Sequence, residues 1–190
     1  MEKIFDLWCK RNPNWETRYQ ASLFDIFVDY GKGTNRYNDA RAVILGSGYE
    51  LFIFAFFIGL YYNKTKPLPV DKSKVKHFGW AIYNWGNKEE KLGRIPYPLI
   101  REYMFMALVA RTEVDWIALD KGEISPRSVV DALMKKMEEY ANFGLNFIEE
   151  KLEEDPNCFF NDKAFLRVFM SFISPDTSDS GFVDDEPDEL

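Results

Sequence analysis

The sequence has few of the side chains that hold metal ions: two cysteines and one histidine in 190 residues. Cys9 and Cys158 lie far apart and follow neither a zinc-ligand spacing nor a C-x-x-C redox spacing. His77 has no cysteine or second histidine near it, so a structural role is expected. We therefore predict no metal site and no cofactor. Two isolated thiols of this kind are typical of a reducing compartment, the cytoplasm.

The sequence also lacks the G-x-S-x-G elbow, the Walker phosphate loop and the G-x-G-x-x-G dinucleotide fingerprint. Its paired acids are sequence neighbours, such as Glu138 with Glu139, and neighbours on a helix point to different sides. Such pairs predict solvated helix faces, whereas glycoside hydrolysis needs two acids that face each other across a cleft. We predict no catalytic residues. An enzyme with an unrecognised helical active site remains an alternative, although the chain is too short for a helical-barrel glycosidase.

No apolar run is long enough to span a membrane. The longest, Leu51–Tyr62, has about a dozen residues, and a spanning helix needs about twenty. The N-terminus has no apolar signal segment, so we expect no membrane contact and a cytoplasmic location. The run predicts a buried helix that starts with a capping box of Ser47 and Glu50 and ends at Asn63. Phe54, Phe57 and Ile58 are expected to be buried in it.

Acidic residues are concentrated at the C-terminal end. Residues 174–190 contain seven acids and no lysine or arginine, which accounts for the whole net charge of -7 and leaves residues 1–173 neutral. Such a composition predicts a disordered tail that can be removed without loss of the fold. Phe182 and Val183 form a small apolar island in this tail. We interpret them as a possible anchor for docking on a basic partner protein.

The rest of the chain has the apolar spacing of helices. Helices are predicted after Asn14, which would be an N-cap, from Ser47, within 77–86 and within 98–114, where Pro98 would lie in the first turn. A long helix follows Ser125 and Pro126 and ends before Asp155, and Gly144 marks a bend or a close helix approach in it. A last helix follows Asp162. The fold class expected is all-α: a compact single-domain bundle of about six or seven helices over residues 1–173.

Lysines gather after the apolar run. The segment 64–76 has five lysines against one acid, and Trp80, Tyr83 and Trp85 follow it. Lysines near aromatic side chains can contact a phosphate backbone or a single strand. The possible nucleic-acid contacts are Lys64, Lys66, Lys72, Lys74 and Lys76. Because the domain is neutral, we expect at most weak binding to DNA, and an ordinary solvated loop is the other interpretation.

Two stretches, YNDARAVILGSGYELFIFAFFIGLYYNKTKPL from Tyr37 and MKKMEEYANFGLNFIEEKL from Met134, carry a family resemblance. They resemble the small helical accessory proteins found with bacterial DNA-phosphorothioation (dnd) systems, over roughly residues 37–170. The shared features are the apolar helix followed by a basic, proline-containing loop, and the later EEYANFGL stretch. These are packing motifs, so the resemblance implies a defence-linked accessory role and no enzymatic residues.

The sequence therefore favours a non-catalytic accessory or adaptor protein of a multi-protein bacterial system, with a protein partner. The first alternative is a weak DNA-backbone binder that uses the Lys64–Lys76 loop. The second alternative is the enzyme with an unrecognised helical active site.

Overall fold

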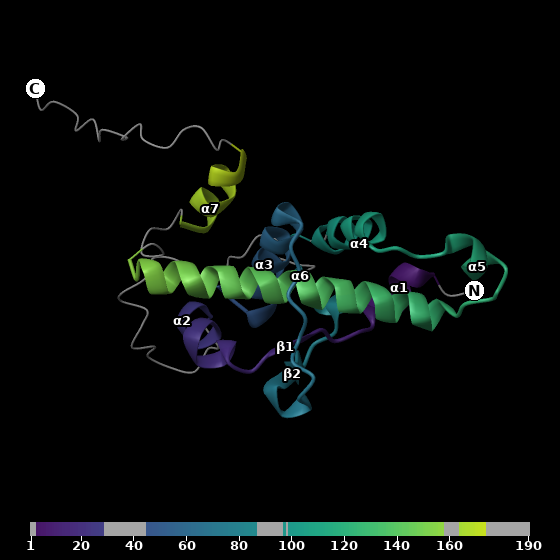
Figure 1. Cartoon of the computed structure of the whole chain (residues 1–190), viewed down its shortest axis with the longest axis horizontal. Coiled ribbons are helices and arrows are strands. Elements are labelled where there is room, and N and C mark those ends of the chain that lie inside the picture. Colours follow the sequence, from purple (N-terminus) through teal and green to yellow (C-terminus); the bar gives the residue numbers. More distant parts are fainter. Residues whose placement is uncertain (1–2, 29–44, 87–96, 98, 158–163, 174–190) are drawn as a thin grey trace, which may run out of the picture.

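The computed structural model describes residues 3–28, 45–86, 97, 99–157 and 164–173. Helix α6, Pro126–Glu154, is the longest element and runs through the middle of the molecule (Figure 1). Its 29 residues make a rod of about 43 Å. The Ser125 side chain accepts a hydrogen bond from the Ser128 amide, and Pro126 occupies the first turn, as the sequence predicted.

Helix α3, Gly48–Tyr62, crosses α6 at very short range. A Cβ atom on Gly144 would lie 1.9 Å from the carbonyl oxygen of Ala55, and one on Gly59 would lie 2.2 Å from that of Tyr140. The predicted close approach at Gly144 is therefore confirmed, and α3 supplies a second glycine to it. Asn63, with φ of 49°, ends α3 in the left-handed conformation.

The N-terminal segment differs from the predicted helix after Asn14. Helix α1, Ile4–Cys9, is followed by strand β1, Asn14–Glu16, which pairs antiparallel with β2, Val75–His77. A π-helical turn, η1, Gln20–Phe24, then leads into the short helix α2, Asp25–Phe27. Asn14 pairs with His77 in this sheet instead of capping a helix, and its amide and side chain both donate to Glu138 of α6, at 2.8 Å.

Shorter elements complete the arrangement around α6. They are the 3₁₀ turns η2, Lys72–Lys74, and η3, Ile82–Asn84, and the helices α4, Ile100–Arg111, α5, Trp116–Asp120, and α7, Ala164–Ile173. The helix predicted within 77–86 is only the single turn η3, and Gly86, with φ of 92°, follows it. Pro98, predicted in the first turn of a helix, and Asp162, a predicted cap, lie outside the described residues.

The core is rich in aromatic side chains. Trp8, Trp85, Phe52 and Phe56 are fully buried, and each such side chain removes a large apolar area from water. Among the described residues the fold is mostly helical, with seven α-helices and one two-stranded sheet. The all-α prediction is corrected to that extent: the β1–β2 pair forms where the N-terminal segment and the lysine segment meet.

Candidate functional site

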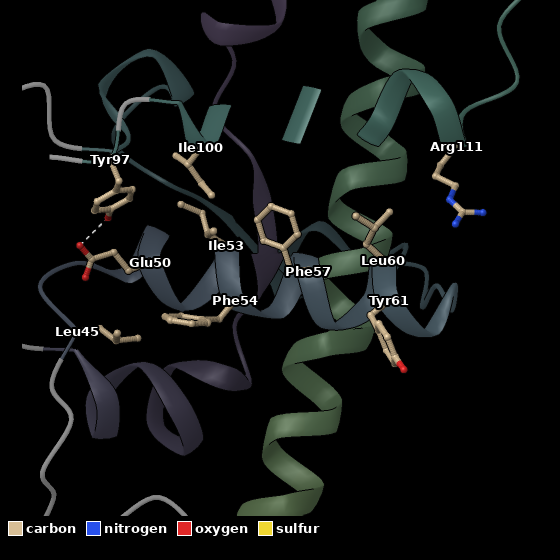
Figure 2. Close-up of a pocket in the computed structure, with 10 residues that line it drawn as sticks. All are labelled: Leu45, Glu50, Ile53, Phe54, Phe57, Leu60, Tyr61, Tyr97, Ile100 and Arg111. Atoms are coloured by element: carbon tan, nitrogen blue, oxygen red, sulfur yellow. Dashed lines mark hydrogen bonds between the residues drawn. The ribbon is translucent and has the colours of Figure 1, made fainter. Parts of the chain in front are cut away.

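A groove of about 950 Å³ lies beside α3 (Figure 2). This volume is in the range of pockets that hold small ligands. Six of its residues come from α3, and the remainder come from α4 and from the segments that precede α3 and α4. The lining residues are Leu45, Glu50, Ile53, Phe54, Phe57, Leu60, Tyr61, Tyr97, Ile100 and Arg111.

The groove exists because α3 is apolar on every side. Its core-facing residues, among them Phe52 and Phe56, are fully buried. The opposite stripe still carries apolar side chains, and these form the floor of the groove. Phe54 and Phe57 are therefore half-buried, which corrects the prediction that both are buried, whereas Ile58 is buried as predicted.

One end of the groove holds a carboxylate whose hydrogen bonds are already made. Glu50 accepts from the Gly46 amide and from the Tyr97 hydroxyl, each at 2.7 Å. The predicted capping box is wrong in detail. The Ser47 hydroxyl makes no hydrogen bond with the described residues, and the Glu50 carboxylate accepts from the amide of Gly46 instead of the amide of Ser47. Burial, and then the nearby Glu50, raise the pKa of the Tyr97 hydroxyl, so it remains a donor at neutral pH.

The other end of the groove holds a guanidinium. Arg111 is the last residue of α4, and Figure 2 shows it on the same side as Leu60 and Tyr61, away from Glu50 and Tyr97. Arg111 is exposed, and no carboxylate of the described residues forms an ion pair with it. The groove is thus apolar along its floor, with a guanidinium at one end that has no ion-pair partner among the described residues.

Helix α7 reaches the groove at Phe54. The Phe165 ring stacks on the Phe54 ring, with centroids 5.0 Å apart, and is itself buried. Phe165 also meets Phe27 edge-on at 5.5 Å. The floor of the groove is therefore continuous with the packing of α2 and α7.

The structure divides the five predicted lysines into two groups. Lys66 is held against α6: its backbone amide donates to the Glu139 carbonyl at 2.9 Å, and its ammonium donates to Asn146. The side-chain amide of Asn142, which is 1% exposed, lies within hydrogen-bond distance of the carbonyls of Lys66 and Pro67. This part of the predicted contact loop has a structural role.

A partly buried polar cluster, in which Glu16 and Asn142 are buried and Arg18 is exposed, surrounds that attachment. Asn142 also donates to Glu16 at 2.7 Å, and Glu16 accepts from Arg18 at 2.8 Å. Arg18 donates in turn to Glu149 and to Asn146. Every charge in the cluster has an opposite charge or an amide beside it, which is how charges tolerate burial. The cluster fastens β1 and the lysine segment to α6.

The other lysines point into solvent. Lys72 and Lys74 lie in η2 and Lys76 lies in β2, and all three are exposed. The one acid among them, Asp71, accepts from the amide and hydroxyl of Ser73, and these hydrogen bonds lower its pKa. Lys64 is exposed too, with its ammonium about 6 Å from the rings of Tyr62 and Phe143.

Phe182 and Val183 lie outside the described residues, as does the acidic tail. His77 is exposed, pairs with Asn14 in the sheet and lies 3.0 Å from the Phe78 carbonyl through Nδ1.

Helix α4 presents apolar side chains to solvent. Leu99, Tyr103 and Met106 are 58%, 53% and 56% exposed, and their spacing places them on one side of the helix. Met104 and Leu108, on another side, are fully buried. We call Leu99, Tyr103 and Met106 the α4 outer face.

No protein-family model matches the chain, and neither the curated proteins nor the solved structures include a match. Within the described ranges, no helix combines the length and apolar character needed to cross a bilayer. The same residues contain no group of three or more potential metal ligands.

The sequence did not reveal the groove. A helix that is apolar all round predicts burial on all sides, and only the positions of α4 and Tyr97 show that one stripe of α3 is left open. The sequence did not single out Arg111, because one arginine near the end of a helix is common.

Proposed function

We propose that the protein is a non-catalytic accessory or adaptor protein, and that it binds a partner protein through the α4 outer face. The observation that carries the proposal is the exposure of Leu99, Tyr103 and Met106 on one side of a helix. Contiguous apolar side chains on a surface mark interaction sites, because leaving them in water is unfavourable. Trp116 and Ile117 of the next helix, α5, are exposed as well.

The chemistry of this face favours a helical partner with a basic rim. Apolar residues at helical spacing fit the groove or ridge of another helix. The exposed charges that follow the face are mostly acidic: Glu113, Asp115, Asp120 and Glu123 against Arg111 and Lys121. Complementary charge on the partner would steer association and fix its orientation.

A two-step experiment tests this proposal. Proteins that copurify with the chain from its native host are identified first, and their binding to purified variants is then measured. A double variant, Tyr103→Glu with Met106→Glu, is expected to lose the partner, whereas Val70→Glu is expected to keep it. Val70 is a matched control because it is apolar and 100% exposed but lies far along the chain from α4.

Two results would contradict the proposal. One is a partner that binds the double variant as tightly as the wild type. The other is an analytical ultracentrifugation result in which the wild type is a dimer and the double variant is a monomer, because the face would then serve self-association.

The resemblance of residues 37–170 to accessory proteins of DNA-phosphorothioation systems supports a bacterial, defence-linked setting for the proposed partner. Under this proposal the partner belongs to such a multi-protein system, and the genes that neighbour this one are the first place to look for it. A partner with no connection to DNA modification or defence would argue against this setting.

A second candidate function is weak binding to the DNA backbone by the lysine tip, which is the turn η2 and the strand β2 that carry Lys72, Lys74 and Lys76. The observation that favours it is the exposure of Lys72, Lys74 and Lys76 together, with Asp71 already engaged by Ser73. Replacing these three lysines by glutamate is expected to abolish DNA retention at low salt. The triple variant of Lys10, Lys121 and Lys135 changes the net charge equally and serves as the control. Retention that is absent in the wild type, or lost equally in both variants, would refute specific use of the tip.

A further inference from the structure

The residues that line the groove beside α3 include none from the α4 outer face and none from the lysine tip. Its floor is formed by Ile53, Phe54, Phe57 and Leu60, so an occupant must be apolar over most of its length. The stretch of α3 from Glu50 to Tyr61 sets the length of the groove at about 16 Å. An extended alkyl chain can lie along a groove of this length.

The two ends of the groove differ in what they offer an occupant. At one end both oxygens of Glu50 accept hydrogen bonds, from Gly46 and from Tyr97, so this carboxylate needs no further partner. At the other end Arg111 is exposed and has no carboxylate partner in the described part of the chain. A guanidinium pairs best with a planar, two-oxygen anion.

We propose that the groove binds a long-chain monocarboxylate of the fatty-acid type. Its carboxylate would pair with Arg111, and its alkyl chain would lie over Phe57 and Phe54 toward Leu45. Charge complementarity at one end and apolar contact along the rest select an occupant with a single anionic head. This proposal stands on the groove alone and does not depend on the proposed partner protein.

Three probes of equal chain length test the proposal with the full-length protein. They are dodecanoate, dodecan-1-ol and dodecylammonium, measured by calorimetry below the concentrations at which they form micelles. Dodecanoate is expected to bind most tightly, the alcohol next and the ammonium least. In a series of saturated carboxylates, affinity is expected to rise about fourfold for each added methylene until the chain exceeds the groove.

Variants at Arg111 and at Phe57 separate the contribution of the carboxylate head from that of the alkyl chain. Arg111→Gln is expected to weaken dodecanoate about tenfold or more, because it removes a charge-assisted pair, and to leave dodecan-1-ol unchanged. Arg111→Lys is expected to recover part of the loss. Phe57→Gln is expected to weaken both probes, and Val70→Gln, at a fully exposed residue that does not line the groove, is expected to weaken neither. Arg111 is exposed, so its variants test the proposal even if Phe57→Gln fails to fold.

Several outcomes would overturn the proposal. They are the absence of saturable dodecanoate binding, equal affinity for the acid and the alcohol, and affinities unaffected by Arg111→Gln. Binding to anionic vesicles without binding to the monomeric acid would also overturn it, because the surface would then recognise a membrane.

Discussion

At the residue scale, two glycines decide how closely α3 and α6 pack. Gly59 and Gly144 face the backbone of the opposite helix, with no room for a side chain at either position. Close backbone approach of this kind lets the flanking side chains interlock. Neither glycine needs a positive φ, so its function is spatial.

Gly144→Ala is expected to destabilise the protein by about 3 kcal/mol or more, because its Cβ would lie 1.9 Å from the Ala55 carbonyl oxygen and the helices would have to separate. Gly79→Ala is the matched control, since a Cβ there meets nothing within 4 Å. Its effect is expected to stay within about 0.5 kcal/mol. Urea unfolding of the three proteins measures both values. Equal stability of the two variants would show that the helices do not cross as described.

Glu138 is a second residue with a measurable signature. Burial raises its pKa above the ordinary value of 4.5, and the hydrogen bonds from Asn14 oppose the shift only in part. A raised pKa means that the folded state holds the proton more tightly than the unfolded state. The stability that Glu138 contributes is therefore greatest at low pH and falls as the pH rises through its folded pKa.

Glu138→Gln removes this titration and keeps an oxygen that can accept from Asn14. We expect the stability of the variant, relative to the wild type, to increase as the pH rises from about 4 to about 7. Unfolding by urea at a series of pH values measures the difference. A difference that is constant, or that decreases with pH, would mean that Glu138 ionises as readily in the folded state as in the unfolded state.

At the element scale, α3 has one face in the core and one on the groove. Ile58 is fully buried, whereas Phe57 is half-buried on the groove floor. We therefore expect Ile58→Ala to cost about 2–5 kcal/mol of stability, and Phe57→Ala to cost less although it removes a larger side chain. Thermal and urea unfolding show which of the two substitutions lowers the stability more. The reverse order would show that the groove is closed and Phe57 is a core residue.

The same elements show what could be predicted from sequence. The start of α6 at Ser125 and Pro126, the end of α3 at Asn63 and the close approach at Gly144 depend on local chemistry, and all three are confirmed. Strand β1 has three residues, and its partner β2 lies about sixty positions away, so no local pattern could reveal it. The groove depends in the same way on where α4 is placed.

At the scale of the whole molecule, α6 is the element on which the others are assembled. It crosses α3 at the two glycines, receives β1 through Asn14 and holds the lysine segment through Asn142. The lysine tip beyond that attachment has no buried residue in η2. Stability should therefore be highest near the middle of α6 and lowest at the tip.

Amide hydrogen exchange measures that distribution. Amides near Leu145, which is fully buried beside the crossing, are expected to exchange only through global unfolding, with the full free energy of unfolding. Amides of Lys72 and Lys74 are expected to exchange through local opening at far lower cost, because η2 is a single exposed 3₁₀ turn. Gly144→Ala should then accelerate exchange near Leu145 by the factor that corresponds to the full loss of global stability. Exchange at the lysine tip should stay unchanged. Equal protection at the two places, or exchange at the lysine tip that also becomes faster in the variant, would mean that the tip unfolds together with α6.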